Sequence, residues 1–212
     1  AVKSSKTYAV LPNVDAGDLL HSRTTGATRV NEYGLVEEVA ANIPRLDYSD
    51  GGCPILLLEP QATNLISSSN SWTIEQDNGS GVTTLTSNYG ISPSGELDAT
   101  RFQFTIDRAT SNTNSDFALT NKGYSATAGL DYTSSVWMKS LNGNATVLFD
   151  NDDVKIRTHE VTTEWKRFYV TRASSSTGSR VNYIGAFGNV GDDDIDILVW
   201  GMQTEESSNA TS

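Results

Sequence analysis

The 212-residue sequence has a single cysteine, Cys53, and only two histidines, His21 and His159. One cysteine excludes an internal disulfide and a cysteine-rich zinc site. The sequence contains no HExxH, GxSxG, P-loop or GxGxxG motif, which removes the local signatures of several enzyme classes. His21 precedes Ser22-Arg23, and His159 lies beside Glu160 in what reads as a polar turn. We therefore expect no catalytic role for either histidine.

Positive charge and long apolar runs are also scarce. Lys and Arg number 15 against 26 Asp and Glu, a net charge of −11, which argues against nucleic acid or an anionic membrane as partner. The longest apolar run, Ile55 to Leu58, is far shorter than the ~20 residues that span a bilayer. No apolar stretch that could serve as a signal peptide follows Ala1 to Lys6. Apolar residues at helical spacing are missing as well, so helix is expected to be minor.

What the sequence contains is a series of short strand patterns separated by turn-forming clusters such as Asn142-Gly143. Alternation over Tyr132 to Ser140 places Val136 and Met138 opposite Trp137 and Lys139. Further strands are expected at Trp72–Gln76, Val82–Thr86, Arg101–Ile106, Asp116–Thr120, Ala145–Phe149, Trp165–Arg172, Val181–Phe187 and Ile195–Met202. This pattern predicts an all-β protein, built as a sandwich or barrel of antiparallel sheets.

The first 65 or so residues read differently from the rest. Ala27 to Val39 predicts a hairpin with its turn at Asn31 to Gly34. Prolines and glycines then interrupt the chain repeatedly around an apolar segment, Ile55-Leu56-Leu57-Leu58. A segment that is apolar on both faces needs cover on both sides, either from the following domain or from another copy of the chain. Ile55, Leu56, Leu57 and Leu58 are therefore the candidate oligomerisation or attachment residues.

Several stretches of the sequence resemble a known family. In the first part they are Ser22-Arg23, Ala27-Thr28-Arg29-Val30-Asn31, Gly34-Leu35-Val36-Glu37, Val39 to Tyr48 and Leu56 to Leu65. In the second part they are Trp72, Ser92 to Gly95, Asp98 to Phe102, Tyr132 to Lys139, Trp165 to Phe168 and Trp200 to Glu205. Together they resemble bacteriophage head-fibre and tail structural proteins that carry a jelly roll similar to carbohydrate-binding modules. Ala62 departs from that pattern, because arginine is usual there.

The resemblance implies a domain order. Residues 1–20 would be an attachment segment, 21–65 an extended and hairpin arm, 66–206 an antiparallel jelly-roll sandwich, and 207–212 a polar tail. It also implies a virion surface location after synthesis in the bacterial cytoplasm, other virion proteins as partners, and a homo-oligomer, for which a trimer is our expectation. Family members often continue past the C-terminal motif, so the chain is expected to be a short version or a fragment of a longer fibre.

Sugar rings have apolar C–H faces and hydroxyl edges, so a glycan site typically combines an exposed aromatic plane with hydrogen-bonding groups. Trp137 is the leading candidate because it shares a predicted strand face with Ser135 and Lys139. Tyr183, near Arg180, is the second candidate. Trp72, Trp165 and Trp200 fit core packing better, and core packing also remains open for Trp137.

Two acidic clusters are candidate calcium ligands, since calcium prefers oxygen-rich loops. One contains Asp150, Asp152 and Asp153, and the other contains Asp192, Asp193, Asp194 and Asp196. Neither has the spacing of an EF-hand, and solvated acidic loops explain both equally well. We therefore predict no cofactor beyond a possible structural calcium.

The resemblance implies a virion structural protein, a head or tail fibre or decoration protein, whose jelly roll binds host or environmental glycans. The alternatives are a carbohydrate-binding module of a secreted bacterial polysaccharide-degrading enzyme, and a jelly roll that only stabilises the shell. An enzyme is not expected, although Glu37-Glu38 and the pair Glu160 and Glu164 would supply the two carboxylates of a glycosidase if they came together.

Overall fold

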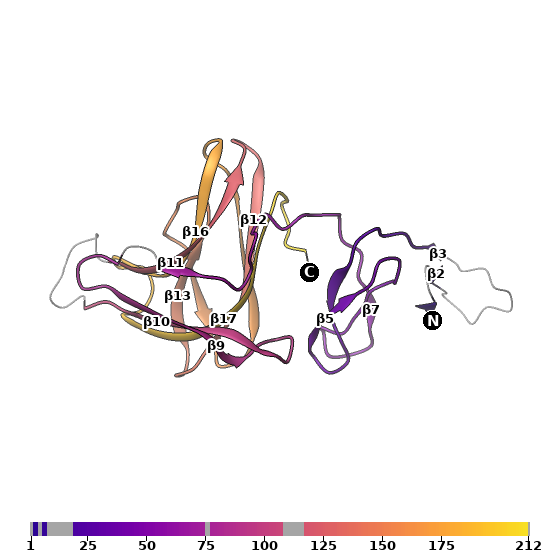
Figure 1. Ribbon diagram of the computed structural model, residues 1–212, viewed down its shortest axis with the longest axis horizontal. Helices are drawn as coiled ribbons and strands as arrows, with labels where there is room; N and C mark the ends of the chain where they lie inside the picture. The colour runs from indigo at the N-terminus through magenta and orange to yellow at the C-terminus, as the bar shows by residue number, and fades with distance from the viewer. Residues whose placement is uncertain (1, 4–5, 8–18, 75–76, 108–116, 212) are drawn as a thin grey trace. The chain divides into compact units, whose positions relative to one another are not determined.

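The computed structural model describes residues 2–3, 6–7, 19–74, 77–107 and 117–211, and within these ranges it contains strands and no helix (Figure 1). A search of the same ranges finds no helix that could cross a membrane. The chain divides into two compact units. We call them the arm (Ala1–Gln61 with Pro93–Gly95 and Thr211–Ser212) and the jelly roll (Ala62–Ser92 and Glu96–Ala210).

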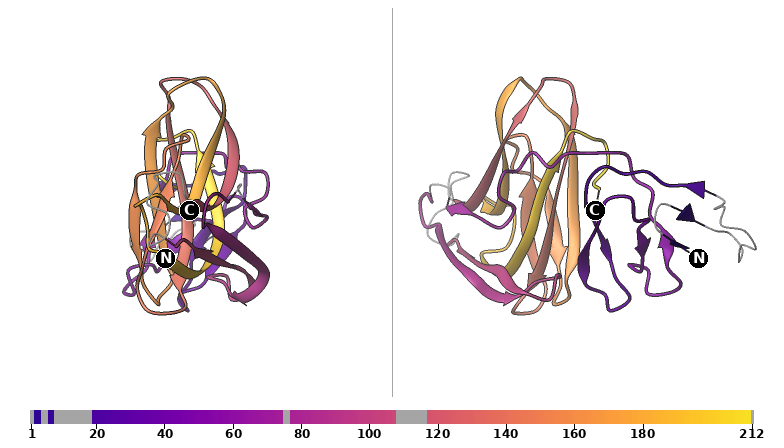
Figure 2. Two further views of the ribbon diagram at one scale, coloured as in Figure 1. Left: turned by 90° about the vertical axis from the view of Figure 1, so that its left-hand side faces the viewer. Right: turned by 45° about the vertical axis from the view of Figure 1, so that its right-hand side comes forward.

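The jelly roll consists of two five-stranded antiparallel sheets that form a sandwich, and both layers can be followed in the views of Figure 2. The first sheet has the order β15 (Lys166–Ala173), β12 (Asp131–Ser140), β17 (Asp194–Glu205), β10 (Leu97–Thr105), β9 (Val82–Ile91). The second has the order β14 (Thr158–Val161), β13 (Ala145–Asp150), β16 (Gly178–Phe187), β11 (Phe117–Ala126), β8 (Thr73–Ile74).

The strand order itself identifies the fold. Strands β10, β12, β15 and β17 lie in the first sheet, and β11, β13, β14 and β16 in the second, so the chain crosses repeatedly between the layers. Two such four-stranded sheets joined by Greek-key connections form a jelly roll. Strands β9 and β8 extend the two sheets at one edge each. The prediction of an all-β, antiparallel jelly-roll sandwich is confirmed.

The core lies between the two sheets and comes from the predicted alternation. Phe102 and Phe104 on β10 and Val136 and Met138 on β12 have no exposed surface. The largest other fully buried side chains of this core are Tyr132, Ile106, Phe149, Ile184, Ile195, Ile197 and Met202. Trp72 packs edge-on against Phe102, with 4.9 Å between ring centroids, as expected for a core tryptophan.

One strand of the jelly roll was not predicted. The segment Thr158–Val161 forms β14 and pairs with β13, whereas its polar sequence suggested a turn around His159. The His159 ring lies between Phe149 and Phe168, with centroid distances of 5.6 and 5.4 Å. Burial lowers the pKa of His159. The histidine is thus part of the sandwich packing rather than a surface turn.

The arm contains the expected hairpin. Strands β4 (Ala27–Val30) and β5 (Val36–Val39) pair, and the Asn31 amide donates to the Leu35 carbonyl across the turn. Gly34 has φ +78° there, a conformation that favours glycine. A second pair joins β6 (Leu46–Asp47) to β7 (Ile55–Leu56).

A small sheet of three two-residue strands lies at the start of the chain. Its strands are β1 (Val2–Lys3), β2 (Lys6–Thr7) and β3 (Leu19–Leu20). The rest of the predicted attachment segment, residues 1–20, lies outside the described residues.

Polar side chains hold the arm together. The Arg23 guanidinium donates to the carbonyls of Val39 and Ala40 at 2.8 and 2.6 Å. Arg45, only 7% exposed, donates to the Thr28 carbonyl and to Glu59 Oε2, at 3.1 and 2.8 Å. These bonds connect segments that are 14 to 17 residues apart in the sequence.

The apolar segment of the arm is not covered within the described chain. Ile55 is 49% exposed and Leu58 is 72% exposed, while Leu56 and Leu57 are half-buried. The cover on both sides that the sequence led us to expect is therefore not supplied by the residues that the structure describes. Cys53, two residues before β7, is exposed and has a free thiol.

Candidate functional site

The candidate site lies on the outer face of the first sheet, the face that points away from the core. On β12, Val136 and Met138 are fully buried, whereas Trp137 and Lys139, which alternate with them, are half-buried. Because side chains alternate along a strand, Trp137 and Lys139 share the outer face. The predicted orientation of this strand is confirmed.

Trp137 has two informative neighbours in the sheet. It pairs directly with Arg167 on β15 and with Trp200 on β17. Residues directly opposite in neighbouring antiparallel strands have Cβ atoms about 5 Å apart on the same face. The sheet thus places a guanidinium group and a second indole on either side of Trp137.

An irregularity in β17 produces this pairing. The register between β12 and β17 shifts between Ser135 and Trp137, and Gly201 in the facing strand has φ +66°. Bulges of this kind change the direction of nearby side chains. The indole of Trp200 is then fixed by a 2.8 Å hydrogen bond from Nε1 to Asp98 Oδ2.

Polar groups surround the two indoles. Arg167 Nη2 donates to Ser135 Oγ at 2.9 Å and to Gln203 Oε1. Lys139 forms no ion pair with any residue of the described chain. Tyr169, which pairs with Ser135 and is 66% exposed, adds an aromatic ring to the same face. We call Trp137, Trp200, Arg167, Lys139 and Tyr169 the Trp137 face.

In the same sheet, an ion pair joins β10 to β17. Arg101 on β10 binds Asp196 through Nε and Nη2 at 2.8 and 2.6 Å. Its guanidinium lies 4.8 Å from the centroid of the Tyr89 ring. Hydrogen bonding to Asp196 raises the pKa of Arg101, so this cation is permanently charged and engaged.

Tyr183, the second glycan candidate, is elsewhere. It lies on β16 in the second sheet, is 8% exposed, and packs with Leu119 and Leu148. The Lys155 ammonium covers its ring at 4.1 Å from the centroid. The structure therefore does not bring Tyr183 together with Trp137 and Lys139.

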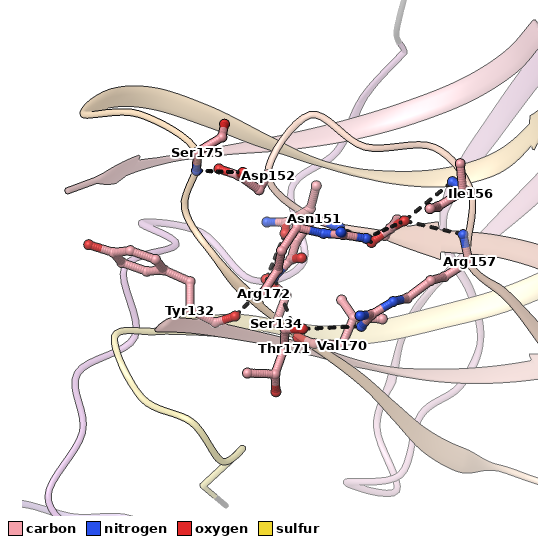
Figure 3. Close-up of polar contacts among 12 residues, drawn as sticks. Tyr132, Ser134, Asn151, Asp152, Ile156, Arg157, Val170, Thr171, Arg172 and Ser175 are labelled. Carbon is pink, nitrogen blue, oxygen red and sulfur yellow. Dashed lines mark hydrogen bonds and ion pairs between the residues drawn. The ribbon is translucent and has the colours of Figure 1, made fainter. Parts of the chain in front are cut away.

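In the first acidic cluster, Asp150 and Asp152 are buried and accept several hydrogen bonds, in the polar network of Figure 3, whereas Asp153 is exposed. Asp150 has no exposed surface and accepts two hydrogen bonds from Arg172 Nη2, at 3.0 and 3.1 Å, with further bonds from the backbone amides of Ile156 and Arg157. Asn151 donates to the Tyr132 carbonyl at 3.0 Å.

Asp152 is held in the same way. It accepts from Ser174 Oγ at 2.7 Å and from the Ser175 amide at 2.8 Å. Burial alone would raise the pKa of Asp152, but these hydrogen bonds and the charge of Arg180 outweigh it and lower the pKa. Together Asp150 and Asp152 anchor the loop that carries Lys155 to Tyr183.

The second acidic cluster is more open. Asp192 accepts a 2.6 Å hydrogen bond from the Thr146 amide, and Asp194 is exposed at the start of β17. Across the part of the chain that the structure describes, no three His, Cys, Asp or Glu side chains are grouped so that they could hold a metal ion. The calcium candidates thus remain in two separate clusters, neither of which is such a group.

Two of the carboxylates considered for hydrolysis, Glu37 and Glu160, accept hydrogen bonds from neighbouring side chains. Glu37 accepts hydrogen bonds from Asn31 and Arg29, which lower its pKa. Glu160 accepts a 2.8 Å bond from Asn144. Glu37 belongs to the arm and Glu160 to the jelly roll.

Two members of the Trp137 face were missed in the sequence. Trp200 was expected to pack in the core, but it is half-buried on the outer face because the core positions of β17 are Ile195, Ile197 and Val199. Arg167 falls within the predicted strand Trp165–Arg172, but no role was expected for it. The register of the sheet shows that both flank Trp137, which a single strand pattern does not reveal.

Comparison with known proteins finds solved structures that are similar to this chain only at low sequence identity and low TM-score. No protein-family model matches the chain, and no curated protein sequence matches it. The CBM22-1–GH10 modules of the Clostridium thermocellum endo-1,4-β-D-xylanase 10B are 14% identical over 71% of this chain and 29% of that chain, with a TM-score of 0.42. The CBM22-1 xylan-binding domain of Paenibacillus barcinonensis is 14% identical over 71% of this chain and 95% of that chain, with a TM-score of 0.41.

A phage protein is also similar at this level. The enzymatically active domain of bacteriophage CBA120 tailspike protein 4 is 14% identical over 66% of this chain and 21% of that chain, with a TM-score of 0.38. Similarities this low do not carry over a ligand or an activity. The assignment of the fold rests on the strand order of the two sheets, which is that of a jelly roll with antiparallel strands throughout.

Proposed function

We propose that this chain is a structural protein of a bacteriophage particle whose jelly roll binds a glycan through the Trp137 face. The observation that carries the glycan part is the direct pairing of Trp137 with Trp200 on an outward sheet face, flanked by Arg167. Elsewhere in the jelly roll Tyr183 is covered and Trp72 packs against the core. Among the aromatic candidates from the sequence, the Trp137 face best suits a ligand.

The chemistry of the face suits a sugar. An indole offers an apolar plane to the C–H face of a pyranose, and burying this plane supplies most of the affinity. Arg167, Ser135 and Gln203 are already joined by hydrogen bonds, so their positions are set before a ligand arrives. Preorganised polar groups lower the entropic cost of binding the hydroxyl edge of the ring.

The virion part of the proposal is supported by the arm. Residues 22–65 carry the resemblance to head-fibre and tail proteins, and the structure leaves Ile55 and Leu58 of that arm exposed. Burying two such side chains against another copy would stabilise an assembly by about 2–4 kcal/mol per chain. We propose a homo-oligomer, with a trimer as the expected size, in which several weak sites act together through avidity.

A glycan array probed with the purified chain tests the glycan part. Trp137→Ala should reduce binding at least tenfold, because the aromatic plane is lost. Tyr33→Ala is the matched control, since Tyr33 is an aromatic residue of the arm that is 79% exposed. Equal binding by Trp137→Ala, with its melting temperature preserved, would contradict the site, and an array without any hit would contradict glycan binding.

Light scattering and mass spectrometry test the virion part. A stable oligomer in solution, together with the chain's presence in purified virions, is the expected outcome. A monomer that binds a defined glycan would instead favour a carbohydrate-binding module of a polysaccharide-degrading enzyme. Leu58→Ser should shift the oligomer toward monomer, whereas Tyr33→Ser should not.

A further inference from the structure

Two asparagine-glycine pairs occur in the sequence, Asn78-Gly79 and Asn142-Gly143, and both are exposed in turns of the jelly roll. Asparagine loses its side-chain ammonia most readily before glycine, because glycine has no Cβ to hinder the approach of its nitrogen to the asparagine Cγ. In a folded protein this deamidation also requires that the peptide between the two residues can rotate. The structure gives the two pairs different freedom in this respect.

The peptide that follows Asn78 is held by hydrogen bonds. The Asn78 carbonyl accepts from the amides of Gly81 and Phe117, at 3.1 and 3.2 Å, and the Asn78 amide donates to the Phe117 carbonyl at 3.2 Å. The turn also lies close against β11, since a Cβ on Gly81 would come within 1.8 Å of the Phe117 carbonyl oxygen. Rotation that brings the Gly79 nitrogen to Cγ of Asn78 would therefore break two backbone hydrogen bonds, which stabilise the turn.

The peptide that follows Asn142 is not held in this way. It lies in the loop between β12 and β13, and no described residue forms a hydrogen bond with the Asn142 carbonyl or the Gly143 amide. Gly143 has φ +81°, and nothing in the described chain lies within 4 Å of the position that a Cβ would take there. The Asn142 side chain donates from Nδ2 to Asp196 Oδ2 at 3.2 Å, a bond that does not restrain the peptide.

We infer that Asn142 is a site of spontaneous covalent modification in the folded protein. The Gly143 nitrogen gives up its proton and bonds to Cγ of Asn142, and the Cγ–Nδ2 bond breaks, so that the side-chain nitrogen leaves as ammonia. Water then opens the resulting succinimide ring at either of its two carbonyls. The products are aspartate, with the original main chain, and isoaspartate, in which the main chain runs through Cγ. Nothing is oxidised or reduced, and water is the co-reactant.

Both products remove an amide donor from the loop and add a negative charge. Asp196 then loses the hydrogen bond from Nδ2, while Arg101 still binds it through Nε and Nη2 at 2.8 and 2.6 Å. The Leu141 amide donates to the Asp196 carbonyl at 2.9 Å, so the loop is attached to β17 at this same residue. A modification that adds a like charge beside a carboxylate acts by repulsion. Deamidation of Asn142 therefore loosens the attachment of the loop to β17.

Peptide mapping by mass spectrometry tests the site, with Asn78 as the control within the same chain. The purified chain is incubated at mildly alkaline pH, and the exchange of NH2 for OH is followed at both asparagines. In the folded chain we expect Asn142 to react about tenfold faster than Asn78 and to give two product peptides of equal mass. In urea the two rates should be similar, because the hydrogen bonds that restrain Asn78 are then lost.

Equal rates at the two asparagines of the folded chain would overturn the inference. So would the absence of reaction at Asn142 over a time in which the unfolded chain reacts there. Asn142→Gln should abolish the reaction at this position, since glutamine would have to close a larger ring. Asn144→Gln is the matched control, because Asn144 is an exposed asparagine of the same loop that donates to Glu160, and it should leave the rate at Asn142 unchanged.

The effect on the loop is tested with Asn142→Asp and Asn142→Ala. Both substitutions remove the amide donor, but only the first adds a charge beside Asp196. The urea midpoint of Asn142→Asp should be the lower of the two at low salt, and the difference should shrink at high salt because exposed charges are screened. Equal midpoints at low salt would contradict the repulsion from Asp196.

Discussion

Different interactions stabilise the interior of the jelly roll and the interior of the arm. In the jelly roll, large apolar side chains such as Phe104 and Met138 lose all exposed surface between two sheets. In the arm, the buried side chains include Arg45 and Asp47, while Tyr33, Ile55 and Leu58 remain exposed. The arm is therefore built from directional polar bonds, and its largest apolar groups contribute little to its own interior.

This difference explains the sequence motif of the arm. Arg23 and Arg45 donate to backbone carbonyls, and Asp47 accepts from the Val30 amide at 2.8 Å. Each of these side chains satisfies a backbone group of the short hairpin strands β4 and β5, and so takes the place of a sheet hydrogen bond. The motif thus preserves a shape that has little hydrophobic core, and its apolar residues remain available for contacts with other molecules.

Removing a core ring should affect only the jelly roll, and by the largest amount. Phe104→Ala should lower its free energy of unfolding by about 3–5 kcal/mol, because the substitution leaves a cavity in a packed core. All four tryptophans, Trp72, Trp137, Trp165 and Trp200, belong to the jelly roll, so urea unfolding followed by tryptophan fluorescence measures this unit. Hydrogen exchange in residues 27–59 should be unchanged.

A matched substitution outside the core sharpens this test. Tyr169→Ala removes a ring that is 66% exposed and should change the same free energy by about 0.5 kcal/mol or less. Loss of arm protection in parallel with Phe104→Ala would show that the two units unfold together, and the comparison would then fail.

Removing a cation should affect only the arm. Arg45→Met keeps the length of the side chain but leaves Glu59 and the Thr28 carbonyl without this donor. Breaking a buried ion pair on one side costs about 3 kcal/mol or more. Hydrogen exchange of residues 27–59 should accelerate accordingly, while the fluorescence transition of the jelly roll stays in place.

The double variant Arg45→Met with Glu59→Gln is the control for that experiment. Removing both charges avoids an uncompensated carboxylate, so protection should recover in part. If the double variant exchanges as fast as Arg45→Met, the ion pair is not the reason for the arm's stability.

Mild acid should lower the stability of the jelly roll and leave that of the arm unchanged. This effect should be smaller than those of the substitutions above. Burial lowers the pKa of His159 below its ordinary value of 6.5, so the unfolded jelly roll takes up a proton more readily than the folded one. Stability is therefore full above pH 6.5 and falls as the pH drops below it. Hydrogen bonds lower the pKa of Glu37 in the arm, so the arm loses this contribution only below pH 4.5.

The measurement is the urea midpoint by tryptophan fluorescence at pH 7.5, 6.5 and 5.5. The midpoint should fall over this range, and His159→Phe should flatten the fall, because no proton is taken up at that position. Arm protection should be constant between pH 7.5 and 5.5. A midpoint as pH-dependent in His159→Phe as in the unchanged protein would assign the effect to other groups.

The sequence predicted correctly the features that depend on the alternation of polar and apolar residues along one strand. The faces of Val136 and Trp137 follow from a period of two, and they are correct because one face of β12 is buried. The strand β14 was missed, since four residues with a half-buried histidine do not show that period clearly. Local patterns also placed the Ala27 to Val39 hairpin correctly.

The composition of the Trp137 face was only partly predictable. Trp137 and Lys139 follow from one strand, but Trp200 comes from a strand 63 residues later, and its alignment depends on the shift near Gly201. Such a register is set by contacts between distant segments. Tyr183 was chosen for its aromatic ring, and the cover that Lys155 provides depends on the anchoring of a loop by Asp150 and Asp152.

The single thiol of the sequence gives a direct readout of how copies meet. Cys53 is exposed and adjoins β7 in the arm, and no other cysteine occurs among the 212 residues. A disulfide requires two Cα atoms within about 7 Å. Any covalent dimer that forms under gentle oxidation must therefore join Cys53 to Cys53, so a non-reducing gel would report arm-to-arm proximity between two chains.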